Sequence, residues 1–405
     1  MSSNEFSSGS KGERVRSDCY VRIKITKKNG IDLSVKSKVD VLYGRSIKEL
    51  VLKILDFYQI KNCEIEIDDK GALPFVIMAR MEAVIRGLGL DGGRQYLPPW
   101  NYEVKKSSRD RFRRSRLYLP GDQPKLFINA AIHRPDGIIL DLEDSVSPVS
   151  KDTARLIVRN ALRSVDFMNS ERMVRINQLP LGLKDIEEIV PQKTDLILLP
   201  KIETADQIRQ VELKIDEIRK KENISGEVFL MPIIESALGI INAFNIASSS
   251  KNIVALAIGL EDYTADIGTK RTNEGKESFF ARSMIVNAAK AAGIQAIDTV
   301  FSDVSDMEGL KASVLEAKSL GFNGKGCIHP RQIQVVHEGF APAADEIAKA
   351  KKIVKAFEHA EKMGLGVVSL GSKMIDPPVV KRALQTIDLA LREGLLGKEW
   401  REDNE

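Results

Sequence analysis

Short apolar segments alternate with longer stretches of helical periodicity through the middle of the chain. Each segment is three to seven residues long and rich in Ile, Leu and Val, which is typical of buried parallel strands. The predicted strands are Leu117–Leu119, Gly137–Leu140, Met173–Ile176, Leu196–Leu199, Val228–Ile234, Ile253–Ile258, Ala296–Val300 and Gly326–Ile328. Eight strands separated by helices predict a (β/α)₈ barrel, and an open doubly wound sheet is the alternative.

Polar residues gather at or just after the ends of these predicted strands. They are Asp141, Glu143, Asp144, Arg175, Lys201, Glu235, Asp262, Asp298 and His329. In a barrel such ends meet at one mouth, whereas in an open sheet they follow an edge. The repeated placement therefore favours the α/β barrel, which we assign to residues 116–340.

Two further units flank the predicted barrel. Residues 1–90 predict a small α+β domain, with strands at Val21–Ile25, Val39–Tyr43 and Cys63–Ile67 and helices at Ile47–Tyr58 and Pro74–Leu88. Residues 91–115 contain turn residues and a Pro pair, which predict a basic linker. Residues 341–405 predict a C-terminal helical arm.

The overall charge limits the classes of partner. Lys and Arg total 61 against 57 Asp and Glu, a balance that argues against nucleic acid. The excess is concentrated in Lys105–Arg116, which we expect to be solvated. The cysteines Cys19, Cys63 and Cys327 form neither a zinc pattern nor a disulfide framework. With no leader and no apolar run of membrane-spanning length, the sequence predicts a cytoplasmic protein.

Glu235 and Asp262 are the best-defined candidate residues for a functional site. Each follows an apolar strand, and no His or Cys stands nearby, so the pair suits a hard cation such as Mg²⁺. A lone acid at a strand–helix junction more often caps the helix. As two carboxylates at one predicted mouth, they favour a metal site.

Charged residues around this pair extend the candidate site. Arg175 stands inside an otherwise apolar strand and must meet anions, either in an ion pair with Asp141 or Glu143 or as a clamp on a substrate carboxylate. Arg116 invites the same interpretation. Some of the acids in the run 141–144, including Asp144, would orient the arginines and the metal-bound waters.

Two other residues have competing interpretations. Lys201 is placed where a Schiff-base lysine would stand, but a metal site needs none, so a structural or anion-binding role is favoured. From local chemistry alone, Asp376, before Pro377 and Pro378, is a helix N-cap.

The motifs just described resemble the citrate lyase β subunit of the HpcH/HpaI aldolase family, over about Arg113 to Leu395. The resemblance is carried by 116–121, 141–146, 174–177, 199–201, 234–235, 259–262, 327–330 and 374–376. It implies a barrel that assembles as a trimer or a multiple of it, with Mg²⁺ on Glu235 and Asp262. It also implies substrate contacts from Arg175 and Glu235, and an Asp376 that reaches a neighbouring subunit's site to handle the α-carbon proton.

The first ninety residues resemble the citrate lyase acyl carrier (γ) subunit. The matching segments are 17–23, 68–73 and 77–83. The resemblance implies that Ser17 carries a phosphoribosyl-dephospho-CoA arm, for which a free CoA thioester is a substitute. An α-type acyl/CoA transferase subunit is the implied partner.

These parts together predict Mg²⁺-dependent retro-Claisen cleavage of a citryl thioester, giving oxaloacetate and an acetyl thioester. Arg175 and Arg116 would stabilise the moving negative charge, with Lys201 as a further substrate contact. Two alternatives stay open: a citramalyl- or malyl-thioester lyase, and a carrier or scaffold subunit with an inactive barrel.

Overall fold

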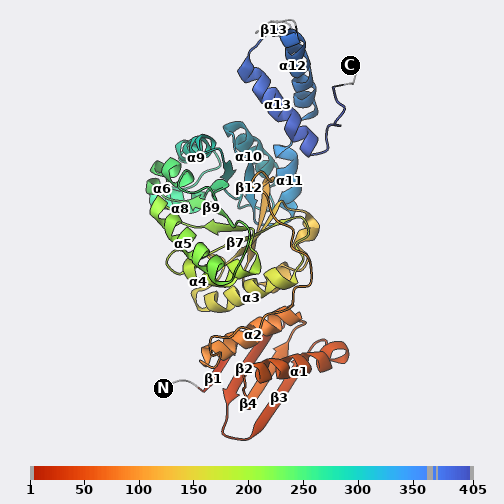
Figure 1. The fold of residues 1–405 in the computed structure, drawn as a ribbon, viewed down its shortest axis with the longest axis vertical. Coiled ribbons are helices and arrows are strands. Elements are labelled where there is room, and N and C mark those ends of the chain that lie inside the picture. The colour runs from red at the N-terminus through yellow and green to blue at the C-terminus, as the bar shows by residue number, and fades with distance from the viewer. Residues whose placement is uncertain (1–3, 363–367, 371–372, 402–405) are drawn as a thin grey trace.

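The computed structural model describes residues 4–362, 368–370 and 373–401. Three units follow one another along the long axis (Figure 1). The N-terminal unit occupies one end, the barrel lies in the middle, and a helical arm forms the other end.

The N-terminal unit is a four-stranded sheet with two helices, which confirms the predicted α+β class. Its sheet has the order β1-β2-β4-β3, with β3 and β4 parallel and the other pairs antiparallel. The elements are β1 (Glu5–Ser8), β2 (Cys19–Ile25), β3 (Gly30–Ser37), α1 (Asp40–Phe57), β4 (Asn62–Asp69) and α2 (Pro74–Gly87). Pro74 at the start of α2 needs no hydrogen-bond partner there, which suits the first helical position.

One predicted strand in this unit is wrong. Val39–Tyr43 contains the start of α1, and the amide of Tyr43 donates to the carbonyl of Val39 at 2.9 Å. Val41 is 98% exposed, so its apolar side chain did not mark a buried strand. The prediction also missed β1 and β3.

The predicted (β/α)₈ barrel is confirmed. Its eight parallel strands close in the order β10-β11-β12-β5-β6-β7-β8-β9. They are β5 (Ser115–Pro120), β6 (Gly137–Asp141), β7 (Glu171–Arg175), β8 (Leu196–Leu199), β9 (Phe229–Ile234), β10 (Ala255–Ile258), β11 (Gln295–Asp298) and β12 (Gly324–Cys327).

Helices surround these strands. They are α3 (Lys151–Ser164), α4 (Gly182–Ile189), α5 (Ala205–Lys221), α6 (Ala237–Ile241), α7 (Ala243–Ala247), α8 (Leu260–Asp266), α9 (Phe279–Ala291), α10 (Met307–Leu320) and α11 (Arg331–Phe340), with short 3₁₀ turns at Pro124–Leu126, Ala130–His133, Pro148–Ser150 and Val190–Gln192. Local chemistry fixes several ends: Thr204 and Gln207 form a capping box before α5, and Asp306 accepts from the Gly309 amide at 2.8 Å before α10.

Successive side chains of the barrel strands point alternately into two apolar cores, one between the strands and the helices and one inside the barrel. On β5, Leu117 and Leu119 face the helices, whereas Tyr118 packs with the interior cluster that includes Met231 and Ile297. By this alternation Arg116, two residues before Tyr118, also faces the barrel interior.

The N-terminal unit is packed on the barrel through α2 and α3. Phe75, Val76 and Ala79 of α2 join the apolar core between the strands and their helices. In the same contact Arg159 donates two hydrogen bonds to Glu82, each 2.8 Å long, and both side chains are fully buried.

The segment between the two units lies against the barrel as well. Arg113 and Glu171 pair at 2.7 Å with neither side chain exposed, and Arg114 pairs with Asp136 at 2.8 Å. Tyr102 donates to the carbonyl of Leu162. The basic run therefore contributes buried ion pairs, and the expectation that it is solvated is wrong for these residues.

The helical arm packs largely within itself. It consists of α12 (Ala344–Lys362), β13 (Val368–Leu370), β14 (Lys373–Ile375) and α13 (Pro377–Arg392). A small core of its own includes Val354, Ile387 and Trp400. In the part of the chain that the structure describes, no helix is both long and apolar enough to cross a membrane.

Candidate functional site

The barrel mouth brings most of the predicted site residues together. Asp141 and Arg175 end neighbouring strands β6 and β7 and stand in register. A cavity of about 480 Å³ opens here. Among the predicted residues, its lining includes Arg116, Asp141, Asp144, Arg175, Glu235 and Asp262. Convergence from several strands is the arrangement that the sequence pattern predicted.

Arg175 is held by the acids that follow β6. Its guanidinium donates to both oxygens of Asp141, at 2.6 and 2.7 Å, and lies 2.9 Å from Glu143. Asp144 is 4.0 Å away. Burial would raise the pKa of Asp141, but the Arg175 hydrogen bonds and charge hold it below its usual range. The ion pair predicted as one alternative is thus present, and it fixes the arginine in the cavity wall beside the ring of Tyr118.

Lys201 crosses the mouth between acids from different loops. Its Nζ lies 3.6 Å from Glu143 and 3.4 Å from Asp262, and its amide donates to Glu235 at 3.1 Å. Burial lowers the pKa of Lys201, yet the surrounding carboxylates led by Glu143 leave it raised. A protonated lysine is a poor nucleophile, so the geometry favours an anion-binding or structural role over a Schiff base.

Glu235 and Asp262 face the same cavity from β9 and α8. Glu235 does not cap the next helix, because Ser236 accepts from the Gly239 amide at 3.1 Å instead. A Cβ at Gly259 would lie 2.3 Å from Glu235 Oε1, so only glycine leaves room for this carboxyl. Burial, followed by the charges of Asp262 and Glu143, raises the pKa of Glu235 to about 8.

The two carboxylates fit an open metal site. Among the described residues, no cluster of three or more His, Cys, Asp or Glu side chains forms a closed metal cage. Mg²⁺ usually takes one or two protein carboxylates and fills its other positions with water and substrate oxygens. A buried carboxyl with a raised pKa beside a second acid is a place where a divalent cation relieves charge repulsion.

Arg116 lies deeper in the cavity than Arg175. It is 1% exposed, its Nη1 contacts the Met231 sulfur at 3.1 Å, and its Nε is buried without a hydrogen-bond partner. Burial lowers its pKa, and no carboxylate of the described residues pairs with it. The prediction placed Arg116 near the site but did not foresee an unpaired cation.

The other predicted residues lie apart from this cavity. Asp376 accepts from the Val379 amide at 3.1 Å and caps α13 in the helical arm. Ser17 lies two residues before β2 with a φ of 53°, and its amide donates to the Lys70 carbonyl at 3.1 Å. His329 accepts the Arg331 amide within its own turn, as expected of a structural residue.

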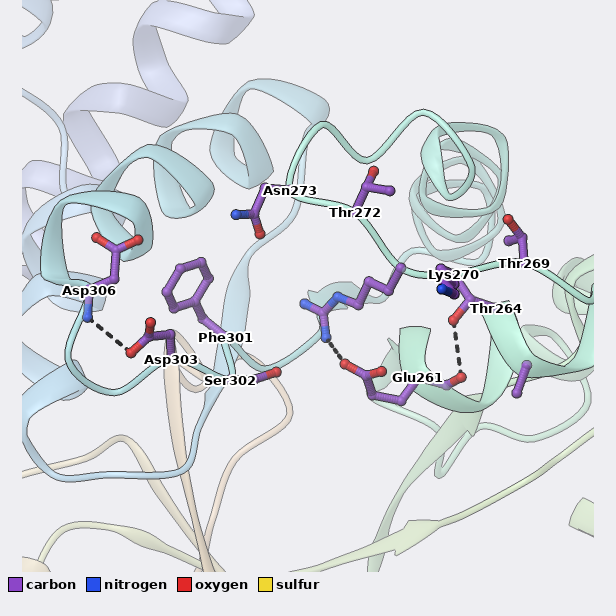
Figure 2. A pocket seen from close by; sticks show the side chains of 12 residues that line it. Glu261, Thr264, Thr269, Lys270, Thr272, Asn273, Phe301, Ser302, Asp303 and Asp306 are labelled. Atoms are coloured by element: carbon purple, nitrogen blue, oxygen red, sulfur yellow. Dashed lines mark hydrogen bonds and ion pairs between the residues drawn. The ribbon is translucent and has the colours of Figure 1, made fainter.

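A neighbouring cavity of about 510 Å³ was not predicted (Figure 2). Figure 2 shows Glu261 and Thr264 on one side and Phe301, Asp303 and Asp306 on the other. Arg271 closes the space between them by donating to Glu261 at 2.7 Å and to the Val300 carbonyl at 2.8 Å. The two basic residues at 270–271, in the loop after α8, are the feature of the sequence that could have indicated this cavity.

Comparisons with known proteins agree with this geometry. The family model of HpcH/HpaI aldolase/citrate lyase matches residues 114–330, and the ACP model, malonate decarboxylase delta subunit (MdcD), matches residues 11–88. The citrate lyase subunit beta of Leuconostoc mesenteroides is 41% identical over 295 residues, which are 72% of this chain and 98% of the relative. The human mitochondrial citramalyl-CoA lyase is 33% identical over 69% of this chain and 85% of its own length.

A solved structure is also similar. The protein CitE from Mycobacterium tuberculosis, in complex with magnesium, acetoacetate and coenzyme A, aligns with a TM-score of 0.59 and 29% identity. The alignment covers 70% of this chain and 99% of CitE. The chain belongs to the HpcH/HpaI aldolase/citrate lyase family, and an ACP-type domain precedes its barrel.

Proposed function

We propose that this protein cleaves a citryl thioester to oxaloacetate and an acetyl thioester, with Mg²⁺ as cofactor. The observation that carries the proposal is the pair Glu235 and Asp262 facing Arg175 in one cavity at the barrel mouth. The carrier-type domain on the same chain supports a thioester substrate. The relative named citrate lyase subunit beta supports the citryl group.

In this proposal Glu235 and Asp262 hold the metal. When bound, Mg²⁺ would make the substrate hydroxyl more acidic and polarise the adjacent carboxylate. The magnesium in the CitE complex supports the choice of metal.

The arginines and the surrounding acids prepare the site for the moving charge. Arg175 stabilises negative charge on the substrate as the C–C bond breaks, because its guanidinium is oriented before substrate arrives. Asp141 and Glu143 orient this guanidinium, and Asp144 lies next to them. Arg116 adds positive charge at the cavity floor.

Asp376 completes the proposed reaction from another subunit. It does not line the cavity of its own chain, so we assign it to a neighbour's site within a trimer or a multiple of one. There its carboxyl would supply the proton to the enolate carbon of the acetyl thioester.

Ser17 is the proposed attachment site of the phosphoribosyl-dephospho-CoA arm. The N-terminal unit packs on α3 through buried side chains, so the arm itself would span the distance to a barrel mouth. A CoA thioester would substitute for the loaded arm, and the coenzyme A in the CitE complex supports this use. An α-type transferase subunit would supply the citryl group.

A citramalyl thioester is the second candidate substrate, favoured by the similarity to citramalyl-CoA lyase. The deciding assay follows oxaloacetate release from citryl-CoA with Mg²⁺, with citramalyl-CoA and malyl-CoA alongside. We expect oxaloacetate release that Asp262→Asn abolishes. Pyruvate or glyoxylate release would keep the lyase chemistry and change the substrate, and inactivity on all three would leave a carrier or scaffold subunit.

Loading at Ser17 needs a separate assay. Ser17→Ala should abolish turnover of carrier-bound citrate while leaving turnover of free citryl-CoA at the wild-type rate. A variant that is still loaded, as seen by intact mass, would move the attachment site elsewhere.

A further inference from the structure

Arg116 differs from the other fully buried arginines of the barrel region. Arg113 pairs with Glu171 and Arg159 pairs with Glu82, each at 2.7–2.8 Å and without solvent exposure. Arg116 is equally buried, but its guanidinium contacts the neutral Met231 sulfur, and no carboxylate of the described residues pairs with it. A guanidinium removed from water without an anion is costly, so a protein keeps one there when an anion arrives from outside.

Within the protein, Asp298 is the carboxylate whose charge acts on Arg116, but it already has other partners. Asp298, on β11, is fully enclosed by two other cations. Arg282 donates to both of its oxygens at 3.2 and 3.1 Å, and Lys325 donates at 2.8 Å. Asp298 is therefore neutralised without Arg116.

The position of Arg116 limits which part of a substrate it can meet. It lines the same cavity as Glu235 and Asp262, from a strand residue four positions before the strand end. In the proposed function, the substrate hydroxyl and its adjacent carboxylate would bind at the metal site of Glu235 and Asp262, at the mouth. The thioester must point outward, because it is joined to a carrier arm or to CoA. The remaining substituent on the hydroxyl-bearing carbon then points inward to the cavity floor.

That substituent is what separates the candidate substrates. It is a carboxymethyl group in a citryl thioester, a methyl group in a citramalyl thioester and a hydrogen in a malyl thioester. We propose that Arg116 binds the carboxymethyl carboxylate and thereby selects citryl over citramalyl and malyl thioesters. This inference rests on the proposed function and assigns the residue that sets its substrate.

The discriminating variant is Arg116→Met, which keeps an extended apolar side chain beside Met231. We expect the variant to lower kcat/KM for citryl-CoA by at least ~100-fold more than kcat/KM for citramalyl-CoA, because only the citryl group has the carboxymethyl carboxylate. Arg271→Met is the matched control. It removes a cation that pairs with Glu261 in the neighbouring cavity, and it should change kcat/KM for both substrates to the same extent.

Product binding gives a second readout that needs no turnover. Oxaloacetate retains the carboxymethyl carboxylate and pyruvate lacks it, so Arg116→Met should weaken oxaloacetate binding and leave pyruvate binding unchanged in calorimetry with Mg²⁺. Arg116→Gln serves the same purpose if the Met variant does not fold.

The outcomes separate the two proposals. Equal loss on citryl-CoA and citramalyl-CoA, or unchanged oxaloacetate binding in the variant, would overturn the role of Arg116 and leave the lyase function standing. A wild-type protein that cleaves none of the thioesters would overturn the function. Selective binding of oxaloacetate over pyruvate through Arg116 would still support the carboxylate site.

Discussion

Two buried clusters of charged side chains in this protein are built in opposite ways. The first lies where α2 packs on α3 and contains Glu82, Arg86, Arg159 and Glu188. Each arginine contacts both glutamates at 2.7–3.1 Å, so the four groups form a closed and neutral set. Burial would raise the pKa of Glu188, but Arg159 and Arg86 hold it below its usual range.

The second cluster, at the barrel mouth, is not neutral. Setting aside the Glu261–Arg271 and Asp298 ion pairs, it contains Asp141, Glu143, Asp144, Glu235 and Asp262 against Arg116, Arg175 and Lys201. Carboxyl groups outnumber cations among these side chains, even when Lys151, which donates to the Glu143 carbonyl beside them, is included. The pKa of Glu235 rises to about 8, and Arg116 has no carboxylate partner among the described residues.

The comparison separates structural from functional charge. Where charges hold two units together, each one has a partner of opposite charge inside the protein. Where ligands are expected, carboxylates crowd one another and a cation is left without an anion. Binding of the metal and the substrate should therefore balance the charges of the mouth cluster and leave the cluster between α2 and α3 unchanged.

The largest expected effect comes from removing a carboxylate of the mouth cluster. Glu235→Gln should lower Mg²⁺-dependent turnover by ~10⁴-fold, about 5 kcal/mol, because a metal ligand is lost. The same variant should unfold at the wild-type temperature or above it, since it removes a carboxyl that burial disfavours. Turnover near the wild-type rate without added metal would contradict the metal role.

Asp376 has a structural role as the cap of α13 and a proposed catalytic role, and one substitution can separate the two. Asn caps a helix about as well as Asp, so Asp376→Asn should leave the melting temperature unchanged. It should lower turnover by ~10³-fold if the carboxyl handles a proton. Asp376→Ala, which loses the cap as well, is the comparison for stability.

The intersubunit arrangement predicts complementation. Mixed assemblies of Asp376→Asn and Glu235→Gln subunits contain some sites in which both groups are native, so activity should partly return on mixing. Mixtures no more active than the separate variants would place both residues in one chain's site.

A smaller effect is expected at the neutral cluster. Arg159→Met leaves Glu82 buried without its bidentate partner and should destabilise the protein by about 3 kcal/mol in urea unfolding. Turnover of free citryl-CoA should not change. The double variant Glu82→Met with Arg159→Met should recover most of the stability. A single variant as stable as the wild type would mean that this contact contributes little.

The sequence predicted the barrel and the mouth for a physical reason. Buried parallel strands are short apolar runs, and the residue that ends each run must point to the mouth, as Asp141 and Arg175 do. The strand at Val39–Tyr43 failed because Val41 and Leu42 are exposed, so their apolar character carried no information about a core.

Apart from the ion pair of Arg175 with the acids after β6, contacts between distant segments were not predicted. Lys201 meets Glu143 across 58 positions, and Arg159 meets Glu82 across 77. No local pattern records such pairs. For the same reason, the absence of a carboxylate partner at Arg116 became visible only when the surrounding strands were in place.

The smallest predicted effect is a dependence of Mg²⁺ affinity on pH. Glu235 has a pKa of about 8, so it is mainly protonated at neutral pH, and Mg²⁺ must displace that proton. Mg²⁺ affinity should therefore rise by up to ~tenfold per pH unit below this pKa and level off above it. Calorimetry in buffers of different ionisation enthalpy should detect about one released proton. Glu235→Gln should bind Mg²⁺ weakly and without this dependence. A wild-type affinity that is constant between about pH 6 and 8 would mean that Glu235 is already ionised and that the crowding of acids at the mouth is compensated within the protein.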